Sequence, residues 1–253
     1  MYWLECTSQI NPFGFQGDFT DDRNALVLKP EGGEIIKTHE YTTEENSQIS
    51  KGTFSITENG SFVGNLIIKS KGTQYDNKFH NESKSVDDLN KFYKNYFSHI
   101  NNLKLKKVNL VNNKEEVEFS EELNIEASEY ANSTAGRLMF SLNAYNPLRG
   151  VPQRYRTRNN PFEISRGFTD YDEITIDLPK GYTVDAKPEN FELKDVFGYY
   201  KTEYVVVNEN QLIYKRTFTT NAGYYDKKEY DNFRKFREQV ARNDNAKIVL
   251  VKN

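Results

Sequence analysis

Hydrophobic and polar residues alternate along much of the chain, and this period of two predicts β-strands. The pattern is clearest in residues 53–57 and 61–68, which flank Glu58-Asn59-Gly60. An Asn-Gly pair between two alternating segments is the strongest short-range signal for a β-hairpin. Further strands are predicted at 103–111, 117–119, 123–127, 137–142, 172–178, 204–207, 212–216 and 247–251. The sequence therefore predicts a mainly β fold with antiparallel strands.

Two segments instead repeat apolar residues every three or four positions, as amphipathic helices do. The first is expected at 85–99, with Ser85 as N-cap and Asp88 in the position of a capping acid. The second is expected at 227–243, with Asp226 as its N-cap. Each helix has one apolar face, which should pack on the neighbouring sheet.

Turn-rich segments divide this pattern into three parts. A Pro/Gly turn at 29–33 lies between two short extended runs, as in a linker strand between domains. We therefore predict a terminal segment at 1–40, a β-sandwich-like domain at 41–155 with the first helix, and a C-terminal β domain at 156–253 with the second helix. The predicted fold is two antiparallel β-sandwich-like domains, each with one packed helix.

Residues 149–160 contain four arginines among glycine, proline and asparagine. Such a segment is either an anion-binding loop or a solvated linker that meets acids of the neighbouring domain. The linker is favoured, because no Gly-rich strand-to-helix turn is present to form a phosphate cradle.

Composition strengthens the β prediction and removes several functional classes. Aromatic residues make up 14% of the 253 residues against 36% hydrophobic residues in total, and aromatic side chains suit half-buried sheet surfaces. The net charge is −3 with acids and bases interspersed, so binding to nucleic acid is not expected. No apolar run of 18 residues occurs, so membrane insertion is not expected either. The single cysteine permits no internal disulfide.

Residues that carry metal or thiol chemistry are scattered. His39, His80 and His99 have no partner at metal-ligand spacing, so neither a metal nor another cofactor is predicted. Cys6 as a nucleophile is not favoured, because on a strand it would face away from Glu5. A lone cysteine beside an aromatic strand is more often a small buried hydrophobic residue.

Two tyrosine pairs, Tyr199-Tyr200 and Tyr224-Tyr225, are candidate ligand-binding residues. Exposed aromatic rings on β-sandwich modules can stack on sugars. A structural role is favoured, with one ring of each pair in the core and the other over the sheet edge.

The opening segment resembles a known family. Its motifs are Trp3-Leu4-Glu5-Cys6-Thr7, Pro12-Phe13-Gly14 and Thr20-Asp21-Asp22-Arg23-Asn24-Ala25-Leu26. They are similar to the closing strand and exit loop of the transglutaminase-like core in multidomain bacterial exported proteins. The resemblance implies that Glu5 occupies the acid position of a Cys-His-Asp triad, where the family usually has Asp. The family's nucleophile and histidine lie upstream of this strand, so the triad is incomplete in this chain.

A second resemblance covers the last third of the chain. Its motifs are Asn160-Pro161-Phe162, Leu178-Pro179-Lys180-Gly181-Tyr182, Phe197-Gly198-Tyr199-Tyr200, Tyr230-Asp231-Asn232-Phe233 and Lys247-Ile248-Val249-Leu250. They look like the uncharacterised domain that follows the transglutaminase-like core in the same proteins. The resemblance implies a periplasmic, cell-surface or secreted location. Since the chain shows no signal peptide, that signal would lie upstream of Met1.

These observations predict a non-catalytic structural or interaction region rather than an enzyme. Its expected partner is the transglutaminase-like core or another protein. The alternative is a carbohydrate- or protein-binding β-sandwich module, with a glycan as the partner in the first case. The third hypothesis is a fragment of a cysteine-dependent amidase or transglutaminase, in which Glu5 supplies the acid to another chain.

Overall fold

The computed structural model describes residues 2–6 and 8–253, and it confirms the mainly β architecture. Its elements, in chain order, are β1 (Asn24–Lys29), β2 (Gly32–Lys37), β3 (Ser47–Ile56), β4 (Phe62–Ser70), α1 (Thr73–Asp76), the 3-10 helix η1 (Phe79–Ser83), α2 (Val86–Tyr96), β5 (Leu103–Asn113), β6 (Glu118–Ala127), β7 (Asn132–Thr134), β8 (Arg137–Ser141), β9 (Phe162–Ile164), β10 (Phe168–Asp177), β11 (Tyr182–Ala186), β12 (Phe191–Asp195), β13 (Gly198–Asn208), β14 (Gln211–Thr220), β15 (Gly223–Tyr225), the 3-10 helix η2 (Lys227–Glu229), α3 (Tyr230–Asp244) and β16 (Lys247–Lys252).

Eight strands form one large sheet in the order β12-β13-β14-β10-β3-β4-β6-β5. All neighbours pair antiparallel except β10 and β3, which run parallel, with Thr169 opposite Ser47. The sheet therefore contains strands from both sides of the boundary predicted at residue 155. That boundary does not separate two sheets, because the edges of β3 and β10 satisfy each other's backbone hydrogen bonds.

A smaller sheet, in the order β11-β16-β8-β7, packs on one face of the large sheet and makes a sandwich with it. One hydrophobic core contains Phe54 from β3, Leu138 from β8 and Ile248 from β16. The C-terminal strand β16 thus lies beside β8, which was predicted to belong to the other domain. The two predicted segments share one core.

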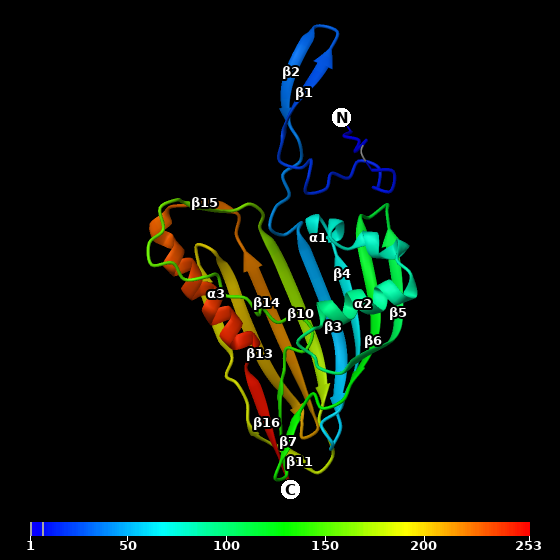
Figure 1. Ribbon diagram of the computed structural model, residues 1–253, viewed down its shortest axis with the longest axis vertical. Helices are drawn as coiled ribbons and strands as arrows, with labels where there is room; N and C mark the ends of the chain where they lie inside the picture. The colour runs from blue at the N-terminus through cyan, green and yellow to red at the C-terminus, as the bar shows by residue number, and fades with distance from the viewer. Residues whose placement is uncertain (1, 7) are drawn as a thin grey trace.

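The two predicted helices are present and cover the rest of this face (Figure 1). Ser85 accepts a hydrogen bond from the Asp88 backbone N–H, as the predicted cap requires. Tyr93 of α2 is buried in the sandwich core, whereas Phe236 of α3 packs with Phe218 in a second cluster. No described helix has both the length and the apolar character needed to span a membrane.

Strands β1 and β2 form a separate hairpin that projects from the body (Figure 1). Leu26 lies opposite Ile35 in this hairpin. The run expected to be a linker strand between domains is therefore a hairpin folded on itself.

Residues 149–160, called the strap below, have no helix or strand and run along α3. The hydroxyl of Tyr230 donates to the Gln153 carbonyl at 2.8 Å, and Nε of Arg234 donates to the Pro152 carbonyl at 2.8 Å. None of the strap arginines forms an ion pair with an acid among residues 2–6 and 8–253. The strap is therefore not the predicted linker that meets acids of a neighbouring domain.

Candidate functional site

The residues of the predicted triad strand lie in a shallow region near the N-terminus. Trp3–Cys6 have no strand hydrogen bonding, and Thr7 lies outside the described residues. Glu5 and Cys6 both line one hollow of about 530 Å³, whereas a strand would have placed them on opposite faces. Cys6 is exposed rather than buried, and its thiol lies 3.8 Å from the Leu4 carbonyl.

The histidines lie elsewhere. His39 Nε2 is 3.2 Å from a carboxylate oxygen of Glu45, and His99 Nε2 is 2.8 Å from the Ala144 carbonyl. Burial lowers the pKa of His99. None of the three histidines lines the hollow that contains Cys6, so the described residues place no Cys-His pair there. They also contain no group of three or more His, Cys, Asp or Glu residues arranged to hold a metal.

The four candidate tyrosines do not form one exposed patch. Tyr200 is fully buried, and its hydroxyl donates to Asp244 at 2.8 Å, so its ring is not accessible to a sugar. Tyr224 is 74% exposed. Tyr199 and Tyr225 are half-buried, and the ring of Tyr225 stacks on Phe162.

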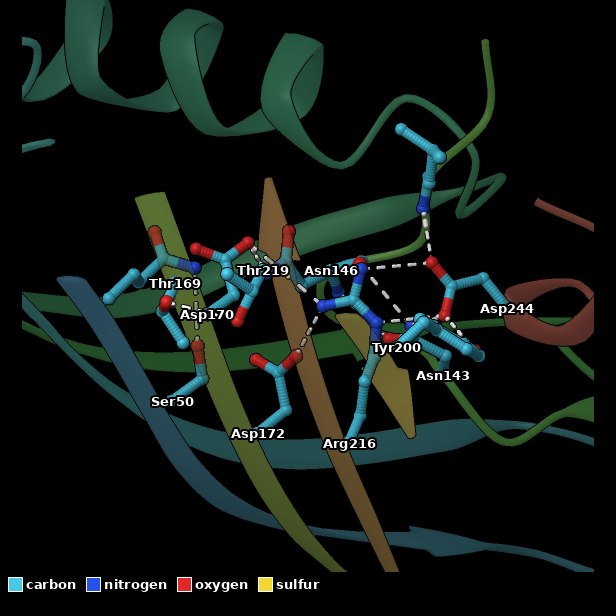
Figure 2. Close-up of polar contacts among 12 residues, drawn as sticks. Ser50, Asn143, Asn146, Thr169, Asp170, Asp172, Tyr200, Arg216, Thr219 and Asp244 are labelled. Carbon is cyan, nitrogen blue, oxygen red and sulfur yellow. Dashed lines mark hydrogen bonds and ion pairs between the residues drawn. The ribbon is translucent and has the colours of Figure 1, made fainter. Parts of the chain in front are cut away.

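A row of polar side chains instead crosses the inner face of the large sheet. Strand register places Ser50, Asp172, Arg216 and Thr202 side by side on β3, β10, β14 and β13. Asp170 lies two residues before Asp172, on the same face. These five residues, called the polar seam below, are all buried. Figure 2 shows four of them, Ser50, Asp170, Asp172 and Arg216, beneath a helix.

Arg216 is the centre of the polar seam. Its Nη1 donates to Asp172 at 2.7 Å, while Nε and Nη2 donate to the two oxygens of Asp244 at 2.8 and 3.0 Å. Asp170 is 4.0 Å away. The Arg216 side chain is 1% exposed, so both ion pairs form away from water. Burial raises the pKa of Asp172 to about 6 even though Arg216 opposes this shift.

Asp244, the last residue of α3, joins this helix to the sheet and to the segment before the strap. It also accepts hydrogen bonds from the Tyr200 hydroxyl, the Asn143 amide and the Leu148 backbone N–H, at 2.8, 3.1 and 2.8 Å. Figure 2 shows Arg216 between Asp172 and Asp244. With five donors on one carboxylate, this cluster stabilises the fold.

A second buried ion pair lies farther along the sheet. Nζ of Lys78 donates to Glu121 and to Gln48, each at 2.8 Å. The hydroxyl of Tyr93 donates to the other oxygen of Glu121 at 2.7 Å. Lys78 is therefore paired. Burial alone would lower its pKa, but the interactions with Tyr96 and Glu121 outweigh burial, so the pKa of Lys78 is raised.

A hollow of about 490 Å³ opens where the two ion-pair clusters meet. Its lining includes Asp170 of the polar seam and Lys78 of the second ion pair. Asp18 and Arg166 line it as well, and Arg166 pairs with Asp21. Its lining therefore contains two acids and two bases.

The sequence alone did not reveal the polar seam, although one signal for it was present. Asp172 and Arg216 occupy inward positions of alternating strands, in phase with Ile174 and Tyr214. A charged residue at an inward strand position must find a partner or remain unpaired in the core. The partner Asp244 could not be identified, because it lies on a helix and approaches only in the folded state.

Comparisons with known proteins give limited matches. Residues 136–250 match the profile of DUF3858, a domain of unknown function with a solved structure. A crystal structure of a "putative protease" from Parabacteroides distasonis is similar in part, with 16% identity and a TM-score of 0.39. The matched region covers 47% of this chain and only 24% of that chain, so the similarity carries no functional argument. No curated protein matches the chain.

Proposed function

We propose that this chain is a non-catalytic structural and interaction region whose residues 2–37 dock a neighbouring protein domain. The observation that carries the proposal is the exposure of large apolar side chains in this segment. These exposed side chains are Tyr2, Leu4, Ile10, Phe13, Phe19, Leu26, Leu28 and Ile35. An apolar surface of this kind on a soluble domain marks an interaction site.

The projecting hairpin is the clearest part of this surface. Leu26, Leu28 and Ile35 are 66%, 80% and 71% exposed. Leu26 and Leu28 lie on one face of β1, and Ile35 lies opposite Leu26 on β2. An isolated two-stranded hairpin is at best marginally stable in water. A partner that covers this face would stabilise the hairpin as well as bury its side chains.

The base of the segment is fixed to the body. Asp21 is buried and pairs with Arg166, whose Nε donates to it at 2.9 Å. Phe15 is also buried and packs edge-on against Tyr75. A domain that docks on residues 2–37 would therefore be held in a defined position relative to the sandwich.

The proposed partner is a transglutaminase-like domain, since residues 3–26 resemble the end of such a core. The same resemblance supports an exported location. The alternative hypothesis was a β-sandwich module that binds a carbohydrate or a protein. Its protein-binding form is part of this proposal, because the docked domain would be the bound protein. The sugar-binding form gains no support, because Tyr200 is buried and only Tyr224 of the four tyrosines is exposed.

The experiment mixes this chain with a separately produced transglutaminase-like domain from a protein that contains both regions, and follows binding by sedimentation velocity. We expect a complex that the variant Leu26→Thr/Leu28→Thr/Ile35→Thr weakens at least tenfold. The matched control is Ile49→Thr/Val63→Thr/Ile67→Thr, which changes exposed aliphatic residues on the large sheet. Equal binding by all three proteins, or equal loss in the control, would contradict the proposal.

Catalysis is tested on the chain alone. We expect no thiol-dependent amidase or crosslinking activity, because no histidine lines the hollow that holds Cys6. Turnover that disappears in Cys6→Ala would refute the non-catalytic role.

A further inference from the structure

We propose that the strap attaches this protein to the surface of an anionic lipid bilayer. This inference concerns a different part of the molecule from the hairpin and goes beyond the docking role. It describes attachment at the surface and requires no segment of the chain to cross the bilayer. It rests on the charge of the strap, on the way its backbone is held, and on the apolar side chains exposed around it.

The strap concentrates positive charge. Its residues include four arginines and no acidic residue, which gives a charge of +4. The whole chain carries −3, so the rest of the chain carries −7. An anionic surface therefore attracts the strap and repels the rest of the molecule, and this difference orients the protein with the strap toward the surface.

The fold does not neutralise this charge. None of the four strap arginines forms an ion pair among residues 2–6 and 8–253. The lysines of η2, Lys227 and Lys228, share one turn with Asp226 and Glu229, so the charges of that turn balance one another. The described chain therefore supplies no ion-pair partner for the strap.

The backbone of the strap is held while two of its guanidinium groups face solvent. The two hydrogen bonds from α3 described above end on backbone carbonyls of the strap. The guanidinium of Arg158 lies 4.2 Å from the centre of the Tyr230 ring. Arg154 and Arg156 are exposed, and their side chains make no hydrogen bond or ion pair with the described residues. Arginine can form paired hydrogen bonds with a phosphate group, so these two side chains suit lipid headgroups.

Exposed apolar side chains lie among and beside these charges. Tyr155, between two of the arginines, is 47% exposed, and Val151 is 37% exposed. Figure 1 shows β15 at the same end of the molecule as the start of α3. Tyr224 of β15 is 74% exposed, and Val196, whose carbonyl accepts from the Tyr225 hydroxyl at 3.4 Å, is 65% exposed. Basic and apolar side chains are therefore interspersed at this end of the molecule.

This combination fits a lipid surface better than an acidic protein. Tyrosine is enriched at the boundary between membrane and water, because its ring is apolar and its hydroxyl remains hydrated. Basic side chains beside it are attracted to anionic headgroups. An acidic protein surface would satisfy the arginines but would not account for the exposed rings between them. The proposed partner is therefore an anionic bilayer.

Cosedimentation of the whole chain with lipid vesicles is the first measurement. We expect binding to vesicles of equal parts phosphatidylcholine and phosphatidylglycerol, no binding to phosphatidylcholine alone, and release by salt, which screens the attraction. No binding to the anionic vesicles, or equal binding to both kinds, would overturn the proposal.

A charge variant tests the arginines. Arg154→Ser/Arg156→Ser should weaken vesicle binding by at least about tenfold, because each basic residue near an anionic surface adds to the affinity. The matched control is Lys104→Ser/Lys106→Ser, which removes the same charge from exposed positions of the edge strand β5. Unchanged binding by the arginine variant, or an equal loss in the control, contradicts attachment through the strap.

A tyrosine variant separates a bilayer from an acidic protein. Tyr155→Ser keeps every charge and should still weaken vesicle binding by about threefold or more, because a ring no longer enters the interface. The matched control is Tyr171→Ser, since Tyr171 is 44% exposed on the outer face of the large sheet. Poly-glutamate of equal total charge should leave most of the protein on the vesicles. Displacement of most of the protein, or equal vesicle binding by Tyr155→Ser and wild type, would identify an acidic protein instead and sink the proposal.

The hairpin variant separates this inference from the docking role. Leu26→Thr/Leu28→Thr/Ile35→Thr should bind the anionic vesicles normally, and Arg154→Ser/Arg156→Ser should bind the transglutaminase-like domain normally. Loss of vesicle binding in the hairpin variant but not in the arginine variant would place the lipid contact on the hairpin and refute the role of the strap. Failure of docking and failure of lipid binding are therefore distinguishable.

Discussion

Arg216 is a charged residue in a position where a strand usually holds an apolar one. It lies on β14 between Tyr214 and Phe218, both buried, and faces the same side of the sheet. Desolvation of a guanidinium is compensated only by close, well-aligned acceptors. Asp172 and Asp244 provide these acceptors. Removal of Arg216 would leave both buried carboxylates without their cation.

The first prediction concerns this loss. Arg216→Met should lower the free energy of unfolding by about 3–5 kcal/mol, because it leaves buried charges unpaired. The matched control is Lys215→Met on the same strand, whose ion pair with Glu173 is exposed. This control should cost no more than about 1 kcal/mol. Urea unfolding of the three proteins measures both values, and similar losses in both variants would contradict the prediction.

The second prediction concerns pH. Burial raises the pKa of Asp172 from 3.8 to about 6, so between these values the folded protein holds a proton that the unfolded chain has released. Stability from this group is therefore present at low pH and is lost as the pH rises toward 6. Relative to Asp172→Asn, the wild type should lose about 3 kcal/mol between roughly pH 3.5 and pH 7. Urea midpoints measured across this range test the sign, and a wild-type advantage that grows with pH would contradict it.

At the scale of elements, the β3–β4 hairpin depends on one glycine. Gly60 has φ +80°, in the left-handed region, and its N–H donates to the Thr57 carbonyl at 2.9 Å. A Cβ at this position would press against the Ala131 carbonyl oxygen. Replacement of Gly60 by another residue is therefore disfavoured both by the positive φ and by the lack of space for a Cβ atom.

The third prediction separates these two effects. Gly181 has φ +77° but no neighbouring atom within 4 Å, so Gly181→Ala should cost only the conformational term of about 1 kcal/mol. Gly60→Ala should cost roughly 2–4 kcal/mol, because the contact with Ala131 adds overpacking. Thermal or urea unfolding gives both values. A Gly60→Ala loss no larger than that of Gly181→Ala would show that the backbone at Ala131 yields freely.

At the scale of the whole molecule, charge is distributed unevenly. The strap and residues 226–245 together contain ten basic and five acidic residues, a net charge of +5, so the rest of the chain carries −8 within the total of −3. None of these ten bases forms an ion pair within the described chain; they are Arg149, Arg154, Arg156, Arg158, Lys227, Lys228, Arg234, Lys235, Arg237 and Arg242. The strap and α3 therefore form an unneutralised basic face on an acidic protein.

The fourth prediction follows from this basic face. At pH 7 and low salt, the protein should bind a sulfonate cation exchanger despite its net negative charge, and salt should release it by screening. Arg154→Ser/Arg156→Ser/Arg242→Ser should elute at clearly lower salt. The matched control Lys104→Ser/Lys106→Ser/Lys107→Ser removes the same charge from β5, where Lys106 and Lys107 are already paired with acids. Earlier elution of the control than of the arginine variant would contradict the basic face.

Much of the local structure could be predicted, because it depends on residues close together in sequence. The Asn59-Gly60 turn, the capped start of α2 and most strands of the large sheet follow from local pattern, although β12 was not predicted. The strand expected at residues 3–7 is not formed by Trp3–Cys6, since a strand needs a neighbour to receive its backbone hydrogen bonds. Local pattern gives the elements but not their neighbours.

The sequence by itself determined that this protein is mainly β, where the helix α2 begins, and that its charges are mixed. It placed the start of α3 at residue 227, where the structure has the 3-10 helix η2, capped by Asp226, before α3 begins at Tyr230. Only the tertiary structure decided that β3 and β10 run side by side in one sheet, that the strap lies on α3, and that Arg216 meets Asp244. The physical reason is the distance along the sequence over which each interaction acts. Alternation and capping act over a few residues, whereas strand order and buried ion pairs depend on segments that meet only when the whole chain has folded.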